Sequence, residues 1–200
     1  IHKSLRKKDV DIYTSAKVEE SDKKGGSFHL KLSGGEKLKV ENILVSVGRG
    51  PNSEGIGLED AGVLTDKKGY IKVDSKLKTN IENIYAIGDV IGGLQLAHVA
   101  SEEGKIAAEI IAGKDRKMDY SVIPWAVFTS PEIGTVGLNA SQAKEKGYEV
   151  CLGSFPFANS GKAYITGETE GFINIVTEKD TGEILGAQMV GPRASDLVHE

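Results

Sequence analysis

The sequence has a single cysteine, Cys151, no apolar run that approaches about 20 residues, and no excess of basic charge. One cysteine excludes an intrachain disulfide and fits a reducing cytoplasm. The lack of a long apolar run argues against a membrane-spanning helix. With 25 Lys and Arg against 29 Asp and Glu, the net charge is −4, which argues against a nucleic-acid or anionic-membrane partner.

What remains is the composition of a globular protein. Hydrophobic residues make up 39% of the chain and charged residues 27%, which is ordinary for a folded domain. Two hundred residues can form one large domain or two small ones. Cys151 lies in a strand-like run, which favours a buried, inert thiol over a nucleophile.

The most informative stretch is residues 79–89, with the sequence TNIENIYAIGD. We expect a buried strand that ends at Gly88 and presents the carboxylate of Asp89 at its tip. Open α/β sheets bind ligands at the carboxyl ends of their strands, and a carboxylate there can accept hydrogen bonds from ribose or sugar-alcohol hydroxyls. The alternative is a plain buried strand followed by an exposed aspartate.

Turn residues divide the part before this stretch into short elements. A helix end is expected at residues 1–8, and residues 42–47, apolar nearly throughout, are typical of a buried parallel strand. Further strands are expected at 11–18, 28–32, 37–40 and 70–73, a hairpin turn at Gly25-Gly26, and a short helix at 58–61.

After Asp89 the pattern predicts one long helix and then a strand-rich region. The helix runs from about Gln95 to Ala112 and is closed by Gly113. Its small residues would permit close packing on a sheet; they are Ala97, Ala100, Gly104, Ala107 and Ala108. Strands follow at 126–129, 135–138, 150–157, 171–177 and 184–190. A helix at 140–146 is capped by Asn139 with Gln142 as its capping-box partner, and another helix begins near Ala194.

Several segments in this order resemble the FAD-dependent pyridine nucleotide-disulfide oxidoreductase family. They are VSVGRGPN (45–52), YAIGD (85–89), QLAH (95–98), FTSPEIGTVG (128–137) and FPFANSGKA (155–163). The last segment favours the lipoamide-dependent branch over glutathione or mercuric reductases, which stay open as alternatives.

The resemblance implies a fold class of α/β plus α+β, built from a Rossmann-like FAD/NAD(P)-binding region and an incomplete α+β dimerisation domain. Residues 1–47 would be the tail of the NAD-binding domain, 48–118 the returning part of the FAD-binding domain, and 119–200 the dimerisation domain without its end. The implied protein is a cytoplasmic homodimer. Its partner would be a lipoyl-bearing acyltransferase or carrier protein.

The resemblance also implies two groups of cofactor-binding residues. Gly88 and Asp89 would hold the ribityl chain of FAD, and Gln95, Leu96, Ala97 and His98 would line the flavin ring. Gly48 and Val18 would contact NAD. A helix that starts at 95–98 would stabilise the negative charge of a reduced flavin near N1 and O2, because helix N-termini favour anions. His98 is interpreted as a capping or packing side chain whose backbone contacts the flavin, and direct chemistry by the side chain is the alternative.

Parts of the family's machinery have no counterpart here. The reaction needs a pair of redox-active cysteines, G-x-G-x-x-G turns for the two pyrophosphates, and a His–Glu pair. The chain has one cysteine, Gly48-x-Gly50 lacks a third glycine at the required spacing, and His199-Glu200 is adjacent. We therefore assign no catalytic or metal-binding residue and expect a C-terminal-half fragment that is inactive alone and holds flavin weakly. A non-catalytic dimerising module is the further alternative.

Overall fold

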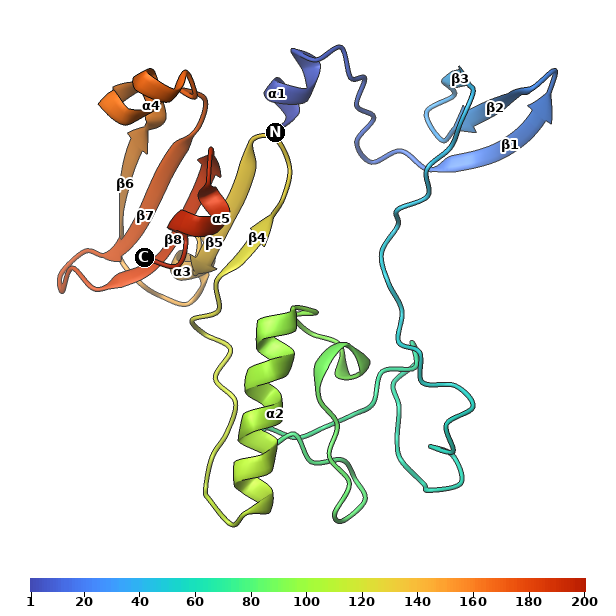
Figure 1. Cartoon of the computed structure of the whole chain (residues 1–200), viewed down its shortest axis with the longest axis vertical. Coiled ribbons are helices and arrows are strands. Elements are labelled where there is room, and N and C mark those ends of the chain that lie inside the picture. Colours follow the sequence, from blue (N-terminus) through green and yellow to red (C-terminus); the bar gives the residue numbers. More distant parts are fainter. The chain divides into compact units, whose positions relative to one another are not determined.

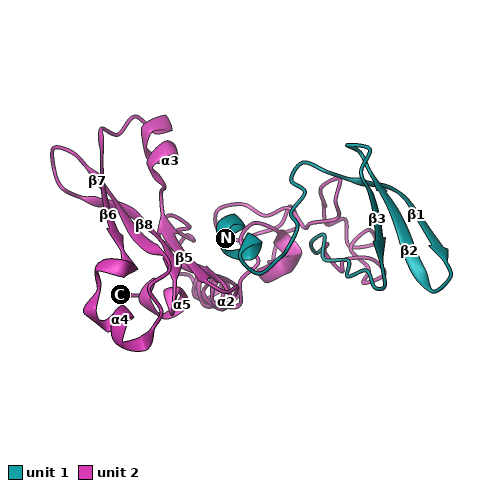
Figure 2. Cartoon of the chain, turned by 90° about the horizontal axis from the view of Figure 1, so that it is seen from above, with its two compact units in different colours: residues 1–49 teal, residues 50–200 magenta.

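The computed structural model describes all 200 residues, which divide into two compact units (Figure 2). The first unit comprises Ile1–Arg49 and the second Gly50–Glu200. Each unit is described by itself. The mixture of helices and two antiparallel sheets confirms the expected α/β and α+β class. The domain boundaries expected after residues 47 and 118 stay predictions.

The first unit contains a short helix and a three-stranded antiparallel sheet in the order β1-β2-β3 (Figure 1). The elements are α1 (His2–Arg6), β1 (Val18–Lys24), β2 (Ser27–Leu32) and β3 (Lys37–Val40). The turn between β1 and β2 is formed by Gly25 and Gly26, both with positive φ. Two positive φ values in succession suit a tight hairpin turn, so the turn predicted at these glycines is confirmed.

Two strands expected in the first unit are wrong. Residues 11–17 form no strand, and β1 begins only at Val18. Residues 42–47 are extended but pair with no other strand, and Leu44 and Val47 are 92% and 93% exposed. A strand becomes regular structure only through hydrogen bonds to a neighbour. Residues 42–47 therefore have the apolar sequence of a buried strand but make no hydrogen-bonded pairing with another strand.

The second unit begins with irregular chain held together by two small apolar clusters. One cluster is built on Val63, Ile71 and Ala86, and the other on Leu77, Ile106 and Ala107. The regular elements of this first part of the second unit are the 3-10 helix η1 (Gly88–Ile91) and helix α2 (Ala97–Ile111). The predicted long helix and its end at Gly113 are confirmed, since the Gly113 N–H donates to the Ile110 carbonyl with φ at 88°.

Three expected elements in this region are reduced to isolated bridges or are absent. Residues 79–87 form no continuous strand, because Asn83 has a φ of 67° and the Thr79 hydroxyl donates to the Ile84 carbonyl across a turn. Only the last residues before Gly88 are extended, with one isolated bridge from Tyr85 to Lys78. Residues 58–61 form a turn and not a helix, and the strand at 70–73 is a single bridge at Ile71.

The rest of the second unit is a five-stranded antiparallel sheet in the order β4-β5-β8-β7-β6 (Figure 1). Its strands are β4 (Trp125–Val127), β5 (Glu132–Gly137), β6 (Val150–Pro156), β7 (Phe172–Glu178) and β8 (Ile184–Gly191). The short helices are α3 (Ala140–Glu145), η2 (Phe157–Asn159), α4 (Gly161–Thr166) and α5 (Ala194–Leu197). Met189, Ala194 and Val198 form the core between the sheet and α5.

The strands and the capping box in this part are confirmed. The Asn139 side chain accepts from the Gln142 N–H, and the Gln142 side chain accepts from the Asn139 N–H. Helix α4 has no counterpart among the expected elements. The buried thiol is wrong: Cys151 is exposed, because β6 lies at the edge of the sheet.

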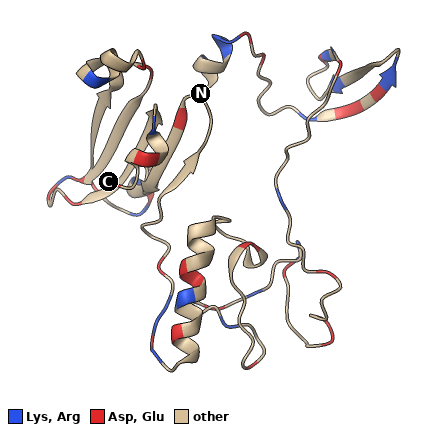
Figure 3. Cartoon of the chain, viewed as in Figure 1, with Lys and Arg blue, Asp and Glu red and all other residues tan.

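The helices are short, and charged side chains of both signs are spread along the chain. The longest helix, α2, has 15 residues, and no helix combines the length and apolar character that crossing a bilayer requires. Acidic and basic side chains are interspersed along the chain, for example on β1 and α2 (Figure 3).

Candidate functional site

The turn between Ala86 and α2, together with the first two residues of α2, carries six of the eight predicted site residues. The chain runs extended to Ile87, turns at Gly88 into η1, passes through Gly92 and Gly93, and enters α2 after Leu96. Gly88, Gly92 and Gly93 all have positive φ. This path brings Gly88 and Asp89 to one side of the turn and residues 95–98 to the other.

Asp89 lies in the first turn of η1, and its side chain is exposed. The backbone of η1 is fixed from the neighbouring chain, because the Ile71 N–H donates to the Val90 carbonyl at 2.9 Å. The Tyr70 ring lies directly beside Gly92, where an added Cβ would be 3.3 Å from a ring carbon. The backbone is therefore held while the carboxylate is open to a ligand.

The start of α2 faces the same turn. Its N-cap residue is Leu96, and no side chain caps the helix. The Gln95 side chain donates to the Asp89 backbone carbonyl at 3.4 Å, which joins the two halves of the turn. The first N–H groups of a helix have no intrahelical acceptor and carry a partial positive charge. An exposed carboxylate beside an uncapped helix start suits a ligand with hydroxyls and a partly anionic group.

Small residues let the turn lie close to α2. At Gly88 an added Cβ would be 3.3 Å from the Ala100 Cβ, and at Gly104 it would be 3.2 Å from Ile87 Cδ1. Gly88 also has a φ of 73°, which a residue with a Cβ rarely adopts. Two residues of the small face expected on this helix, Ala100 and Gly104, therefore pack on residues 87–88 and not on a sheet.

The His98 ring contacts protein. Its Nε2 lies 2.9 Å from the Pro124 carbonyl oxygen, a contact that a protonated Nε2 makes by donating. This contact supports the interpretation of His98 as a packing side chain. Its backbone remains at the first turn of α2.

One residue that sequence reasoning missed is Glu103, a carboxylate buried to 3% exposure on α2. The Gly88 N–H donates to its Oε2 and the Tyr120 hydroxyl donates to its Oε1, both at 2.7 Å. Burial and the hydrogen bond to Glu103 raise the pKa of the Tyr120 hydroxyl. The sequence does contain a signal for this burial: Glu103 lies one helical turn from both Ala100 and Ala107, on the helix face formed by small residues.

The two predicted NAD residues lie in the first unit. Val18 opens β1, where it pairs with Leu32 and is 57% exposed. Gly48 has a φ of 112° and lies in the extended, unpaired run that follows β3. No hydrogen bond joins these two residues, and their roles stay predictions.

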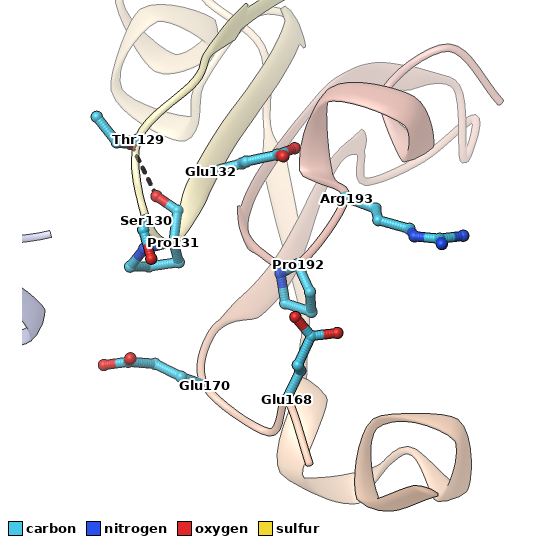
Figure 4. Close-up of a pocket in the computed structure, with 8 residues that line it drawn as sticks. All are labelled: Thr129, Ser130, Pro131, Glu132, Glu168, Glu170, Pro192 and Arg193. Carbon is cyan, nitrogen blue, oxygen red and sulfur yellow. Dashed lines mark hydrogen bonds between the residues drawn. The ribbon is translucent and has the colours of Figure 1, made fainter. Parts of the chain in front are cut away.

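A separate hollow of about 510 Å³ lies in the strand-rich part (Figure 4). It is lined by Thr129, Ser130, Pro131, Glu132, Glu168, Glu170, Pro192 and Arg193. The three carboxylates do not converge in Figure 4, and no group of metal-ligating side chains occurs in the chain. Glu132 accepts from both the Ser195 hydroxyl, at 2.6 Å, and the Ser195 N–H, at 3.0 Å. This hollow contains none of the predicted site residues.

The Glu132–Ser195 contact predicts a pH dependence. Hydrogen bonds from Ser195 lower the pKa of Glu132 below its ordinary 4.5. A carboxyl with a lowered folded-state pKa stabilises the fold above about pH 4.5 and loses that contribution as the pH falls through the folded pKa. We therefore expect the urea concentration at which the sheet unfolds, followed by Trp125 fluorescence, to decrease as the pH is lowered below about 4.5. Ser195→Ala should shrink the fall, and an unchanged pH profile in that variant would contradict the assignment.

Comparison with known families identifies both parts of the chain. Residues 1–104 match the family described as pyridine nucleotide-disulphide oxidoreductase, and residues 123–200 match the dimerisation domain of that family. A protein named dihydrolipoyl dehydrogenase from Bacillus subtilis is 42% identical over the whole chain, which spans 43% of that relative's length. One of the same name from Halobacterium salinarum is 46% identical over 82% of the chain, which covers 34% of its length.

Solved structures agree in fold. LpdA from Mycobacterium tuberculosis superimposes with a TM-score of 0.90 at 28% identity, over 98% of this chain and 43% of its own. The HOCl-induced flavoprotein disulfide reductase RclA from Escherichia coli gives 0.91 at 27% identity, over 99% of this chain and 46% of its own. Because the family profile covers more than half of the residues, and the dimerisation profile most of the rest, the chain belongs to the pyridine nucleotide-disulphide oxidoreductase family.

Proposed function

We propose that this chain forms part of a dihydrolipoyl dehydrogenase, a flavoprotein that oxidises protein-bound dihydrolipoamide with NAD. The observation that carries the proposal is the exposed Asp89 carboxylate, which follows Gly88 on the turn that Gln95 joins to the uncapped start of α2. The name of the relatives at 42% and 46% identity supports the lipoamide branch. The chain spans less than half the length of those relatives, so the activity belongs to the proposal.

FAD, when bound, supplies the electron transfer between a disulfide and NAD. The role of this chain is to bind and orient it. Asp89 accepts hydrogen bonds from ribityl hydroxyls, and Gly88 allows close approach of the backbone. Gln95, Leu96, Ala97 and the His98 backbone line the flavin ring, where the positive end of α2 stabilises negative charge near N1 and O2. Val18 and Gly48 contact NAD in the same proposal.

The strand-rich part is proposed to join two copies of the protein. Residues 123–200 match a dimerisation domain. Large apolar side chains are exposed there, which is typical of an interface. They include Leu152, Phe155, Tyr164, Ile165, Phe172 and Ile175. A lipoyl-bearing acyltransferase or carrier protein is the proposed partner of the dimer. A cytoplasmic location, suggested by the single free cysteine, completes the proposal.

The 200-residue chain by itself is expected to show no NADH-linked lipoamide reduction. The reaction needs two cysteines that cycle between dithiol and disulfide, and the chain contains only Cys151. The measurement is NADH consumption by a homogeneous sample supplied with FAD and lipoamide. Turnover by that sample would contradict the account. The complete flavoprotein serves as the positive control.

A second candidate is another disulfide reductase of the same family. The similarity to RclA, with a TM-score of 0.91, favours keeping it. The complete flavoprotein, assayed in parallel with lipoamide, glutathione disulfide and mercuric ion, separates the two. Preference for lipoamide supports the proposal, and preference for another substrate overturns it. No activity with any of them, together with a dimer in sedimentation, would favour a non-catalytic dimerising module.

A further inference from the structure

The buried carboxylate of Glu103 has no assigned role in the proposed function. Its two oxygens accept hydrogen bonds from different parts of the chain, one from the Gly88 N–H and one from the Tyr120 hydroxyl, both at 2.7 Å. The residue is 3% exposed, although it lies on a helix whose other acidic residues, Glu102 and Glu109, are partly exposed. A buried carboxylate is costly unless it is hydrogen-bonded, so its placement calls for an explanation.

The residue that Glu103 holds is the one immediately before Asp89. Gly88 has a φ of 73°, and the chain changes there from an extended run to η1. Ala100 and Gly104 contact the same turn from α2, one turn before and one residue after Glu103. The turn is therefore fixed to α2 by close packing and by one charged hydrogen bond.

The second oxygen of Glu103 fixes the carboxylate itself. Tyr120 lies beyond the end of α2, and its hydroxyl reaches back to Oε1. With both oxygens occupied, rotation of the carboxylate is restrained and Oε2 stays aimed at Gly88. Tyr120 therefore acts on the turn through Glu103.

We propose that Glu103 is a positioning residue of the flavin site: its carboxylate, oriented by Tyr120, holds the Gly88 backbone so that Asp89 meets the ribityl hydroxyls. The inference rests on the proposed function. It adds a residue that touches no cofactor and acts through the Gly88 N–H. The inference predicts that the length of the side chain at position 103 matters more than its charge. A neutral side chain of the same length can still accept the hydrogen bond from the Gly88 N–H.

The test compares three replacements of Glu103 with a control on the same helix. Glu103→Gln keeps the length and an oxygen acceptor, and its amide can donate to the Tyr120 oxygen. Glu103→Asp keeps the charge but is one methylene shorter, so it cannot reach both partners. Glu103→Ala removes both bonds. Glu102→Ala is the matched control, since Glu102 pairs only with Lys105 on the surface.

Two readouts separate the positioning role from stability and from the proposed function. The first is the Gly88 amide resonance of the 200-residue chain, whose proton shift and exchange rate report the hydrogen bond without any cofactor. The second is the dissociation constant of FAD in the complete flavoprotein, measured where circular dichroism shows each variant folded. Glu103→Asp and Glu103→Ala should alter the Gly88 amide and weaken FAD binding by about tenfold. Glu103→Gln and Glu102→Ala should leave both readouts close to wild type.

The outcomes distinguish the two levels of the account. An unchanged Gly88 amide in Glu103→Ala overturns the inference whatever FAD does. A changed amide with unchanged FAD affinity overturns the link from Gly88 to the flavin. Rescue by Glu103→Asp but not by Glu103→Gln overturns the claim that reach matters more than charge. Failure of the wild-type flavoprotein to bind FAD overturns the proposed function, and the inference with it, even if the Gly88 amide responds.

Discussion

Replacing Asp89 by alanine is expected to weaken FAD binding to the complete flavoprotein by about tenfold to a hundredfold. The carboxylate is exposed on a turn whose backbone is hydrogen-bonded to Ile71, and the substitution removes the proposed charged hydrogen bonds to the ribityl hydroxyls. Hydrogen bonds to charged groups contribute about 1.5–3 kcal/mol, which corresponds to this range of affinity. The measurement is titration of the apoprotein with FAD, followed by quenching of flavin fluorescence.

The matched control for this prediction is Asp60→Ala. Asp60 is also exposed and lies in the same unit, but it is outside the predicted site. FAD affinity should stay within about twofold of wild type in that variant, since surface substitutions usually change free energies by less than 0.5 kcal/mol. Equal losses in the two variants, or no loss in Asp89→Ala, would remove Asp89 from the flavin site.

Replacing Gly186 by alanine is expected to destabilise the five-stranded sheet by about 3 kcal/mol or more. The added Cβ would lie 2.3 Å from the Leu138 carbonyl oxygen, 2.5 Å from the Leu138 nitrogen and 2.8 Å from the Val136 carbonyl oxygen. All three neighbours are backbone atoms of β5 or of the residue that follows it, so the clash is relieved only if the strands of the sheet move apart. Trp125, the only tryptophan, lies in β4 of the same sheet and reports its unfolding in urea.

Gly153→Ala provides the comparison in the same sheet. Gly153 lies in edge strand β6, and the nearest atom to an added Cβ is the Ile175 carbonyl oxygen at 3.9 Å. This substitution should change the free energy of unfolding by less than about 1 kcal/mol, because no atom has to move. If the two variants unfold at the same urea concentration, the close approach at Gly186 does not govern the stability of the sheet.

Local sequence signals predicted the features whose causes are local. Asn139 and Gln142 stand three residues apart, and their mutual hydrogen bonds need nothing from elsewhere in the chain. Gly25 and Gly26 form the hairpin turn because their own backbone freedom permits it. Gly113 ends α2 for the same reason. Propensity and spacing are sufficient information for such features.

Burial could not be predicted in the same way, because it depends on distant partners. Residues 42–47 have the composition of a buried strand, yet Val47 is 93% exposed and the run pairs with no strand. Cys151 lies in a correctly predicted strand but is exposed, since β6 is at the edge of the sheet. Alternation and hydrophobicity specify a strand and leave its neighbours open.

The candidate site shows the same division. Gly88 and Asp89 were identified because they are adjacent within a recognisable motif, and the structure brings Gln95 against the Asp89 backbone. Glu103 was not identified because it lies 15 residues from Gly88 in the sequence. The two residues meet only through the way the turn packs on α2. An acidic residue on an otherwise small helix face is the pattern that would have revealed it.

The most direct test of the central claim is a crystal structure of the flavin-loaded protein that includes this chain. We expect an Asp89 carboxylate oxygen about 2.5–3.0 Å from a ribityl hydroxyl oxygen, with the flavin ring against residues 95–98. An Asp89 carboxylate directed into solvent, with the ribityl chain bound by other residues, would contradict the account.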